Sequence, residues 1–182
     1  EVSTTQLYTV TYNIDSGNTQ TQQFSTGESV ITGLNFTPSK SGYTFVGWRE
    51  DTTASSSVLS SKTMETSNMT LYAVFSQNVT VTKYNGSSSA TTETKAKYYN
   101  NGNAANPSFT LSQNGLSGWT AAGWTTSTSA TGSTAVNNGG SVTLSSNATY
   151  YGKYTQTITL SYSGNGATGG STASQTGTRY YN

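Results

Sequence analysis

The seven residues GYTFVGW (42–48) place three aromatic side chains close together in a chain that is otherwise rich in Ser, Thr, Asn and Gly. Thr, Tyr, Phe, Val and Trp suit a pleated, half-buried strand. Because alternate residues of a strand face opposite sides, we expect Tyr43 and Phe45 on one face and Val46 and Trp48 on the other. The stretch is therefore predicted to be a core strand, and the alternative is an exposed aromatic platform for a ligand.

The pattern returns as GWTAAGW (118–124), with Gly, Thr, Gly and Trp at matching positions. In the second copy Tyr43 becomes Trp119 while Phe45 becomes Ala121. The larger aromatic side chain at one position offsets the smaller side chain at the other, as expected of a core that keeps its total volume. Trp48 and Trp124 occupy the same repeat position, so both are predicted to be buried.

Other segments repeat in the same order, which predicts a first module over 1–77, a divergent second over 78–155 and an incomplete third over 156–182. Repeats joined by two or three residues are expected to form a semi-rigid, rod-like array. The recurring segments are YTVTYN (8–13) with VTVTKYN (79–85) and TITLSYS (157–163), NMTLYAVFS (68–76) with NATYYGKYT (147–155), and KYYN (97–100) with RYYN (179–182).

Alternation along the segment that closes each repeat predicts which residues are buried. Leu71, Ala73 and Phe75 share one face and are expected in the core. On the opposite face Val74 corresponds to Lys153, so this face is expected to be solvated.

The third repeat contains only the opening hairpin, because its GxTxxGW and closing segments are missing. The apolar alternation matches Ile158 and Leu160 to Val79 and Val81. A lone hairpin is marginal in water. We therefore expect 156–182 to pack on repeat 2 or on a neighbouring molecule, or to be the least ordered part of the chain.

The composition excludes several classes of function. Only 8% of the 182 residues are charged and the net charge is +1, which disfavours binding to nucleic acid. No apolar run approaches the ~20 residues that span a bilayer, so no membrane insertion is expected in this segment. Cysteine and histidine are both absent, which removes disulfides, thiolate catalysis and the commonest general base and metal ligand. No cofactor, metal site or catalytic residue is predicted.

Three short motifs have plainer explanations than chemistry. GNGATG (164–169) satisfies the dinucleotide pattern GxGxxG, but no helix-forming sequence follows it, so a hairpin loop is predicted. NIDSGN (13–18) offers Asp and Asn oxygens without the acidic ligands of a calcium loop, and an Asx turn is favoured over a weak metal site. RED (49–51) has adjacent acids that face opposite ways on a strand, so a solvated turn is favoured over a catalytic pair. An internal Lys–Asn crosslink would need a buried acid beside the lysine, and Lys62 with Glu65 or Lys95 with Glu93 are nominal candidates for the lysine and the acid.

Exposed aromatic residues are the remaining candidates for a ligand site. Trp119 and the two YY pairs, Tyr98–Tyr99 and Tyr180–Tyr181, are expected to be partly exposed, so stacking on a sugar ring or contact with a host protein is considered for them.

The first repeat resembles the Listeria–Bacteroides repeat family, also called the internalin B-repeat. The resemblance is carried by PSKSGYTFVGW (38–48), by the TM pair (63–64) and by NMTLYAVF (68–75), with Phe75 where the family often has Trp. Repeat 2 is divergent, because YAVF has become YGKY. The resemblance implies a mainly β fold, α+β at most, of small β-grasp-like modules with a short helix or none. It also implies tandem modules in bacterial surface or secreted proteins and transfers no catalytic residues.

The expectation is therefore a non-enzymatic, extracellular or cell-surface repeat segment that acts as a stalk or spacer and takes part in adhesion. The chain carries no recognisable signal peptide and is expected to be a mature fragment. The alternative is a glycan- or mucin-binding module that uses Trp119, Tyr98 and Tyr99.

Overall fold

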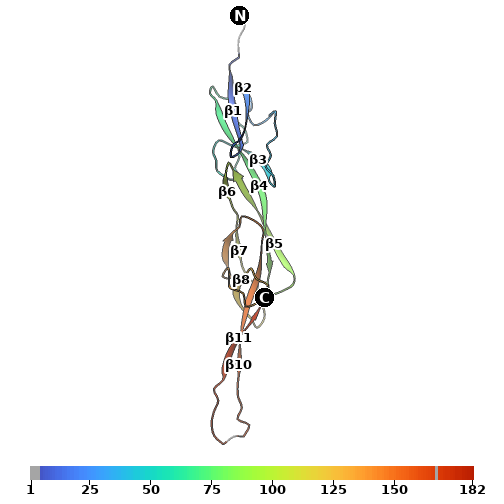
Figure 1. Cartoon of the computed structure of the whole chain (residues 1–182), viewed down its shortest axis with the longest axis vertical. Helices are drawn as coiled ribbons and strands as arrows, with labels where there is room; N and C mark the ends of the chain where they lie inside the picture. The colour runs from blue at the N-terminus through green and yellow to red at the C-terminus, as the bar shows by residue number, and fades with distance from the viewer. Residues whose placement is uncertain (1–4, 167) are drawn as a thin grey trace. The chain divides into compact units, whose positions relative to one another are not determined.

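The computed structural model describes residues 5–166 and 168–182, and these form strands β1 to β11 and no helix. The prediction of a mainly β chain is confirmed (Figure 1). The chain divides into two compact units. Unit 1 contains the residues up to Val79 together with Lys95–Pro107, and unit 2 contains Thr80–Thr94 and Ser108–Asn182.

Unit 1 is built on one mixed sheet. Strands β1 and β2 form an antiparallel hairpin, and the free edge of β1 receives β4 in parallel, with Val10 beside Met69. Strand β3 pairs antiparallel with the other edge of β4, and the end of β5 pairs with β6. The strands are β1 (Leu7–Asp15), β2 (Asn18–Ser25), β3 (Thr44–Arg49), β4 (Met69–Tyr84), β5 (Ala90–Asn100) and β6 (Asn103–Ala105).

Unit 2 repeats this plan. The end of β4 pairs with β5 and receives β10 in parallel, with Val81 beside Ala148, and β8 pairs antiparallel with β10. Strand β11 pairs with the later half of β10, while β7 and β9 form a separate two-stranded sheet. The strands are β7 (Ser108–Leu111), β8 (Thr120–Thr125), β9 (Gly140–Thr143), β10 (Ala148–Leu160) and β11 (Gln175–Tyr181).

An asparagine fixes the start of the parallel pairing in both units. The Thr9 amide donates to Asn68 Oδ1 at 2.8 Å, and the Thr80 amide donates to Asn147 Oδ1 at the same distance. A side-chain oxygen thus accepts from a strand-edge N–H that would otherwise lack a partner. The Asn that opens NMTLYAVF and NATYYGKY is therefore a register lock.

The second glycine of GxTxxGW is explained by a close crossing of the chain. A Cβ on Gly47 would lie 2.7 Å from Val58 Cγ2, and one on Gly123 would lie 2.6 Å from the carbonyl oxygen of Val136. In both units the chain returns across the strand and donates a backbone amide to the Trp carbonyl, at 2.8 Å for Trp48 and 2.7 Å for Trp124. Only glycine leaves room for that return.

Trp48 and Trp124 are 3% and 0% exposed, so the prediction that they belong to the core is confirmed. The prediction that Phe45 and Trp48 face opposite sides is wrong. Their ring centroids lie 5.2 Å apart, because the register with β4 shifts between Phe45 and Gly47. Such a bulge adds one residue to the strand and reverses the alternation beyond it.

The prediction of a solvated face at Val74 and Lys153 is also wrong, because Val74 is 0% exposed and Lys153 is 8% exposed. The Lys153 ammonium donates to the Gly132 carbonyl and, at 3.2 Å, to Thr134 Oγ1. The segment that returns across β8 therefore covers this face and supplies the acceptors that a buried cation needs.

The third-repeat hairpin packs on repeat 2, which confirms one of the three outcomes expected for 156–182. Strand β11 belongs to unit 2 and pairs with β10 from Tyr154 to Leu160. The Tyr181 hydroxyl donates to the Gly86 carbonyl at 3.1 Å.

Candidate functional site

Each unit is covered by a strand from the next sequence repeat, and these covering strands carry the repeated YY pairs. The covering strand of unit 1 is residues 95–100 of β5, and that of unit 2 is β11. The KYYN and RYYN segments therefore serve the unit before their own repeat. This exchange places Tyr98 and Tyr99 in unit 1 and brings Tyr181 beside Trp119 in unit 2.

In unit 1 the covering strand places Tyr99 against a carboxylate and an ammonium group. The Tyr99 hydroxyl donates to Asp15 Oδ1, and Lys40 Nζ donates to Asp15 Oδ2. Lys40 Nζ also lies 4.0 Å from the centre of the Tyr99 ring, a cation–π distance. The ring of Tyr43 completes the cluster at 5.8 Å from Tyr99.

These contacts shift both charged groups toward their ionised forms. Partial desolvation raises the pKa of Asp15, but the hydrogen bonds from Lys40, Tyr99 and the Ser16 amide outweigh it, so the pKa lies below its usual range. Partial desolvation lowers the pKa of Lys40, but the hydrogen bond to Asp15 outweighs it and raises the pKa. An ionised pair held in this way is a structural contact and a poor nucleophile or general base.

In unit 2 the equivalent residue, Tyr181, contacts two aromatic rings and a backbone carbonyl. Its ring lies 5.5 Å from Trp119 and 6.5 Å from Tyr154. The guanidinium of Arg179 lies 5.2 Å from the centre of the Trp119 ring. Trp119 thus takes the place that Tyr43 holds in unit 1.

The three aromatic residues predicted for ligand contact are divided between the units. Trp119 is half-buried in unit 2, whereas Tyr98 and Tyr99 are half-buried in unit 1. The Tyr99 hydroxyl is occupied by Asp15, while Tyr98 lies on the opposite face of β5 beside Ala105 of β6. Their role in ligand contact stays a prediction.

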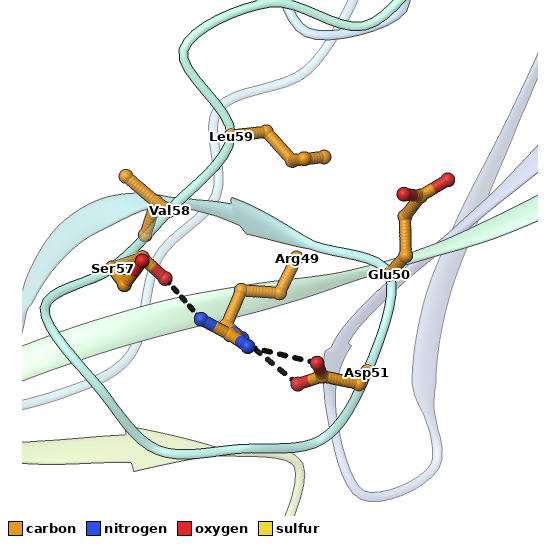
Figure 2. Close-up of a pocket in the computed structure, with 6 residues that line it drawn as sticks. All are labelled: Arg49, Glu50, Asp51, Ser57, Val58 and Leu59. Carbon is orange, nitrogen blue, oxygen red and sulfur yellow. Dashed lines mark hydrogen bonds and ion pairs between the residues drawn. The ribbon is translucent and has the colours of Figure 1, made fainter.

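A hollow of about 230 Å³ lies beside β3 in unit 1, around RED (49–51) (Figure 2). Arg49 donates to both carboxylate oxygens of Asp51 at 2.8 Å, and its third nitrogen donates to the Ser57 carbonyl. Glu50 extends away from this pair in Figure 2 and forms an ion pair with Lys62 at 2.6 Å. The two adjacent acids therefore do not converge on one reacting group.

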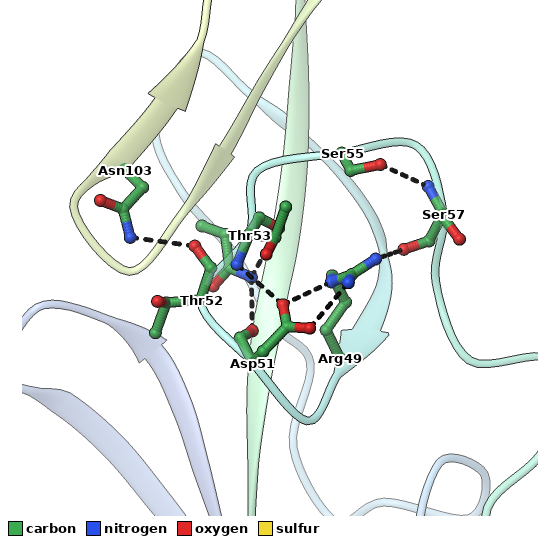
Figure 3. A network of polar contacts seen from close by, with 8 residues as sticks. Arg49, Asp51, Thr52, Thr53, Ser55, Ser57 and Asn103 are labelled. Atoms are coloured by element: carbon green, nitrogen blue, oxygen red, sulfur yellow. Dashed lines mark hydrogen bonds and ion pairs between the residues drawn. The ribbon is translucent and has the colours of Figure 1, made fainter.

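The same loop is tied to the covering strand of unit 1 (Figure 3). The buried Asn100 side chain donates to the carbonyls of Asp51 at 2.9 Å and Thr53 at 3.1 Å. Asn103, just past the turn, donates to the Thr52 carbonyl at 2.9 Å. The Arg49 fork holds the loop, and the two asparagines attach it to the covering strand.

This network has a clear electrostatic effect and no free reactive group. The hydrogen bond from Arg49 and the Thr53 amide hold the pKa of Asp51 well below its usual range. Every nitrogen of the Arg49 guanidinium donates to the loop. Lys62, nominated for a crosslink, also forms an ion pair with Glu65 at 2.9 Å, and both of its acids are more than half exposed.

Sequence reasoning missed an aromatic groove in unit 2. The rings of Tyr84 and Tyr151 stack at 5.1 Å with an interplanar angle of 10°. With Tyr181 and small polar residues they line a hollow of about 290 Å³. The parallel register pairs Tyr84 with Tyr151 where unit 1 pairs Asn13 with Tyr72, so this stack is specific to the second repeat. The sequence signal that could have revealed the stack is Tyr84, which stands where repeat 1 has Asn13.

Within residues 5–166 and 168–182 no group of three or more Asp or Glu side chains is placed to hold a metal ion. The same residues include no helix long and apolar enough to cross a membrane.

Comparison with known proteins gives one match. Residues 8–74 match the family model of the Listeria-Bacteroides repeat domain, which covers the first repeat and less than half of the chain. No curated protein and no solved structure matches the chain. The resemblance proposed for the first repeat is therefore confirmed, and the relation of the second repeat to it depends on the shared register locks and crossings described above.

Proposed function

We propose that the chain is a non-catalytic repeat segment of an extracellular bacterial surface protein, in which β-grasp-like modules form a rod-like spacer that also contributes to adhesion. The match of residues 8–74 to a repeat family of surface proteins supports the class. The low charge and the absence of His and Cys agree with a structural role outside the cell.

One observation carries the spacer role. The chain crosses between the units three times, and two of these crossings lie inside paired strands, at Val79–Thr80 in β4 and at Thr94–Lys95 in β5. The backbone of a strand is already extended, so crossings of this kind add little slack when the chain is pulled. Repeats connected in this way suit a segment that transmits force.

Optical tweezers test this proposal. The chain is held by its two ends and stretched through repeated cycles. We expect abrupt, cooperative lengthening events followed by refolding when the force is released. Gradual extension at low force would refute the spacer role. A hydrolytic activity of the chain that disappears in Asp51→Asn would refute the non-catalytic assignment.

Glycan binding is the second candidate function, favoured by the groove of Tyr84, Tyr151 and Tyr181. Aromatic rings lined by small hydroxyl and amide side chains suit the apolar and polar faces of a sugar. Unit 1 lacks this stack, so the fold itself does not require it.

A glycan and mucin array with the intact chain tests this candidate. Binding that disappears in Tyr151→Ala or Trp119→Ala and survives in Tyr98→Ala would place the site in unit 2. Absence of binding, or binding that all three variants retain, would remove this function.

A further inference from the structure

The later half of β10 exposes apolar side chains at positions that are buried in repeat 2. Leu160 is 56% exposed, whereas Val81 and Val10, its counterparts in the first strands of repeats 2 and 1, are both 0% exposed. Ile158 is 46% exposed, whereas its counterpart Val79 is 1% exposed. The side chains have the apolar character of core residues but lack the cover that repeats 1 and 2 have.

The two complete repeats identify what covers this position. In each, the free edge of the hairpin's first strand is paired in parallel with a strand that begins with Asn: β4 after Asn68 and β10 after Asn147. The residue after the Asn lies beside Val10 in one repeat and beside Val81 in the other. In the third hairpin Leu160 takes this place, and Thr159 takes the place of Thr9 and Thr80.

We propose that the edge formed by the end of β10 (Ile158–Leu160) and the two residues after it, Ser161 and Tyr162, is a docking site for one extended strand of the closing type, supplied by a further repeat. The strand carries Asn followed by apolar residues at alternating positions, and it adds in parallel to β10. Its Asn side chain accepts a hydrogen bond from the Thr159 amide, as Asn68 does from Thr9. The first residue after the Asn then lies beside Leu160, and the third residue after the Asn lies beside Tyr162.

The face of the hairpin beside this edge is open. Ile158 and Leu160 form part of a hollow of about 350 Å³ with Gln175, Thr176 and Gly177. Gly177 is the cross-strand partner of Ile158, so no side chain from β11 covers the isoleucine. Added strands gain main-chain hydrogen bonds from the edge and specificity from alternate side chains.

A labelled peptide tests the site on the intact chain. The peptide SNMTLYAVFS, the sequence of residues 67–76, carries a fluorescein label, and binding is followed by fluorescence anisotropy. We expect saturable binding that weakens about fivefold when Ala replaces the peptide Asn, because one net hydrogen bond is lost. Leu160→Ser in the protein should weaken binding tenfold or more, because an apolar contact is lost. The matched control Thr159→Ser keeps the amide and changes the opposite face, so its affinity should not change.

Several results would overturn the proposal. They are absence of saturable binding, equal binding of a scrambled peptide, or equal binding to the Leu160→Ser variant. Dimerisation of the chain that Leu160→Ser abolishes would assign the edge to a second copy instead. The Asn-to-Ala peptide tests the site without altering the protein, so a folding defect in the variant cannot mimic the result. The spacer role is tested separately by the response to force and does not depend on this outcome.

Discussion

The hydroxyl group of Tyr99 offers a sharp test of how a covering strand stabilises the unit before it. In Tyr99→Phe the ring keeps its place against Tyr43 and Lys40, and only the hydrogen bond to Asp15 is lost. The hydroxyl of Tyr181 in unit 2 is the matched control, because it donates to the uncharged Gly86 carbonyl at 3.1 Å and because Tyr181 itself is 40% exposed.

The structure sets the size of the effect. A hydrogen bond to a charged group contributes about 1.5–3 kcal/mol, and a neutral one about 0.5–1.5 kcal/mol. Asp15 keeps its contacts with Lys40 and the Ser16 amide, so we take the lower figure of about 1.5 kcal/mol for Tyr99→Phe. For Tyr181→Phe we expect about 0.5 kcal/mol. With a urea dependence of about 1 kcal/mol per molar for a small unit, the midpoint of unit 1 should fall by about 1.5 M.

Urea titration of the amide spectrum by NMR gives separate midpoints for the two units. The loss of stability in Tyr99→Phe should appear in unit 1 alone. Because the folded-state pKa of Asp15 is lowered, its contribution is present above the unfolded value of about 3.9 and is lost as the pH falls through the folded value. The difference between wild type and variant should therefore be full at pH 7 and shrink at pH 2. Equal midpoints at pH 7, or a difference that is unchanged at pH 2, would refute the reasoning.

Three further predictions concern other parts of the fold. Gly123→Ala should lower the free energy of unfolding of unit 2 by about 2 kcal/mol or more, since the new methyl group would lie 2.6 Å from a backbone oxygen, whereas Gly115→Ala, with open space around it, should cost little in the same urea titration. Asn147→Ala removes the register lock and should cost about 1 kcal/mol; an unchanged unfolding midpoint would show that the lock is dispensable. A ¹³C titration should give Asp51 a pKa below the usual ~3.9 that returns toward it in Arg49→Met, and an ordinary value in the wild type would contradict the bidentate pair.

The sequence was sufficient to predict what depends on repetition. The recurrence of GxTxxGW indicated that Trp48 and Trp124 are core residues, and both are buried. The apolar alternation of the third hairpin matched Leu160 to Val81, and this alignment stays a prediction. Two repeats with the same fold place the same residue type where the packing requires it, so residues shared between the repeats indicate shared structure.

The errors came from features that alternation cannot express. A one-residue bulge after Phe45 reversed the faces of the core strand, and its only sequence signal was the glycine that follows. Burial of Lys153 depends on acceptors from Gly132 and Thr134, which lie 21 and 19 positions away in the sequence.

The covering strands were not predicted, because they join one repeat to the preceding unit. A sequence repeat is a continuous segment with a recurring order of residues. A compact unit is defined by contacts, and it can include a segment from the next repeat. Tyr99 donates to Asp15 across 84 positions, a pairing that no local pattern reports. Tyr84 and Tyr151 were missed for the same reason, since their stack arises from the parallel pairing of β4 with β10.

Each unit is completed by a strand from the next repeat. Hydrogen exchange of the 182-residue chain, compared with that of a version that ends at Gln156, tests this. Without β11 and the last four residues of β10, we expect faster exchange around Gly86, Trp119 and Tyr154 in unit 2, with unchanged exchange in unit 1, whose covering strand remains. Unchanged exchange throughout unit 2 would contradict the claim and would mean that each sequence repeat folds without the strand that follows it.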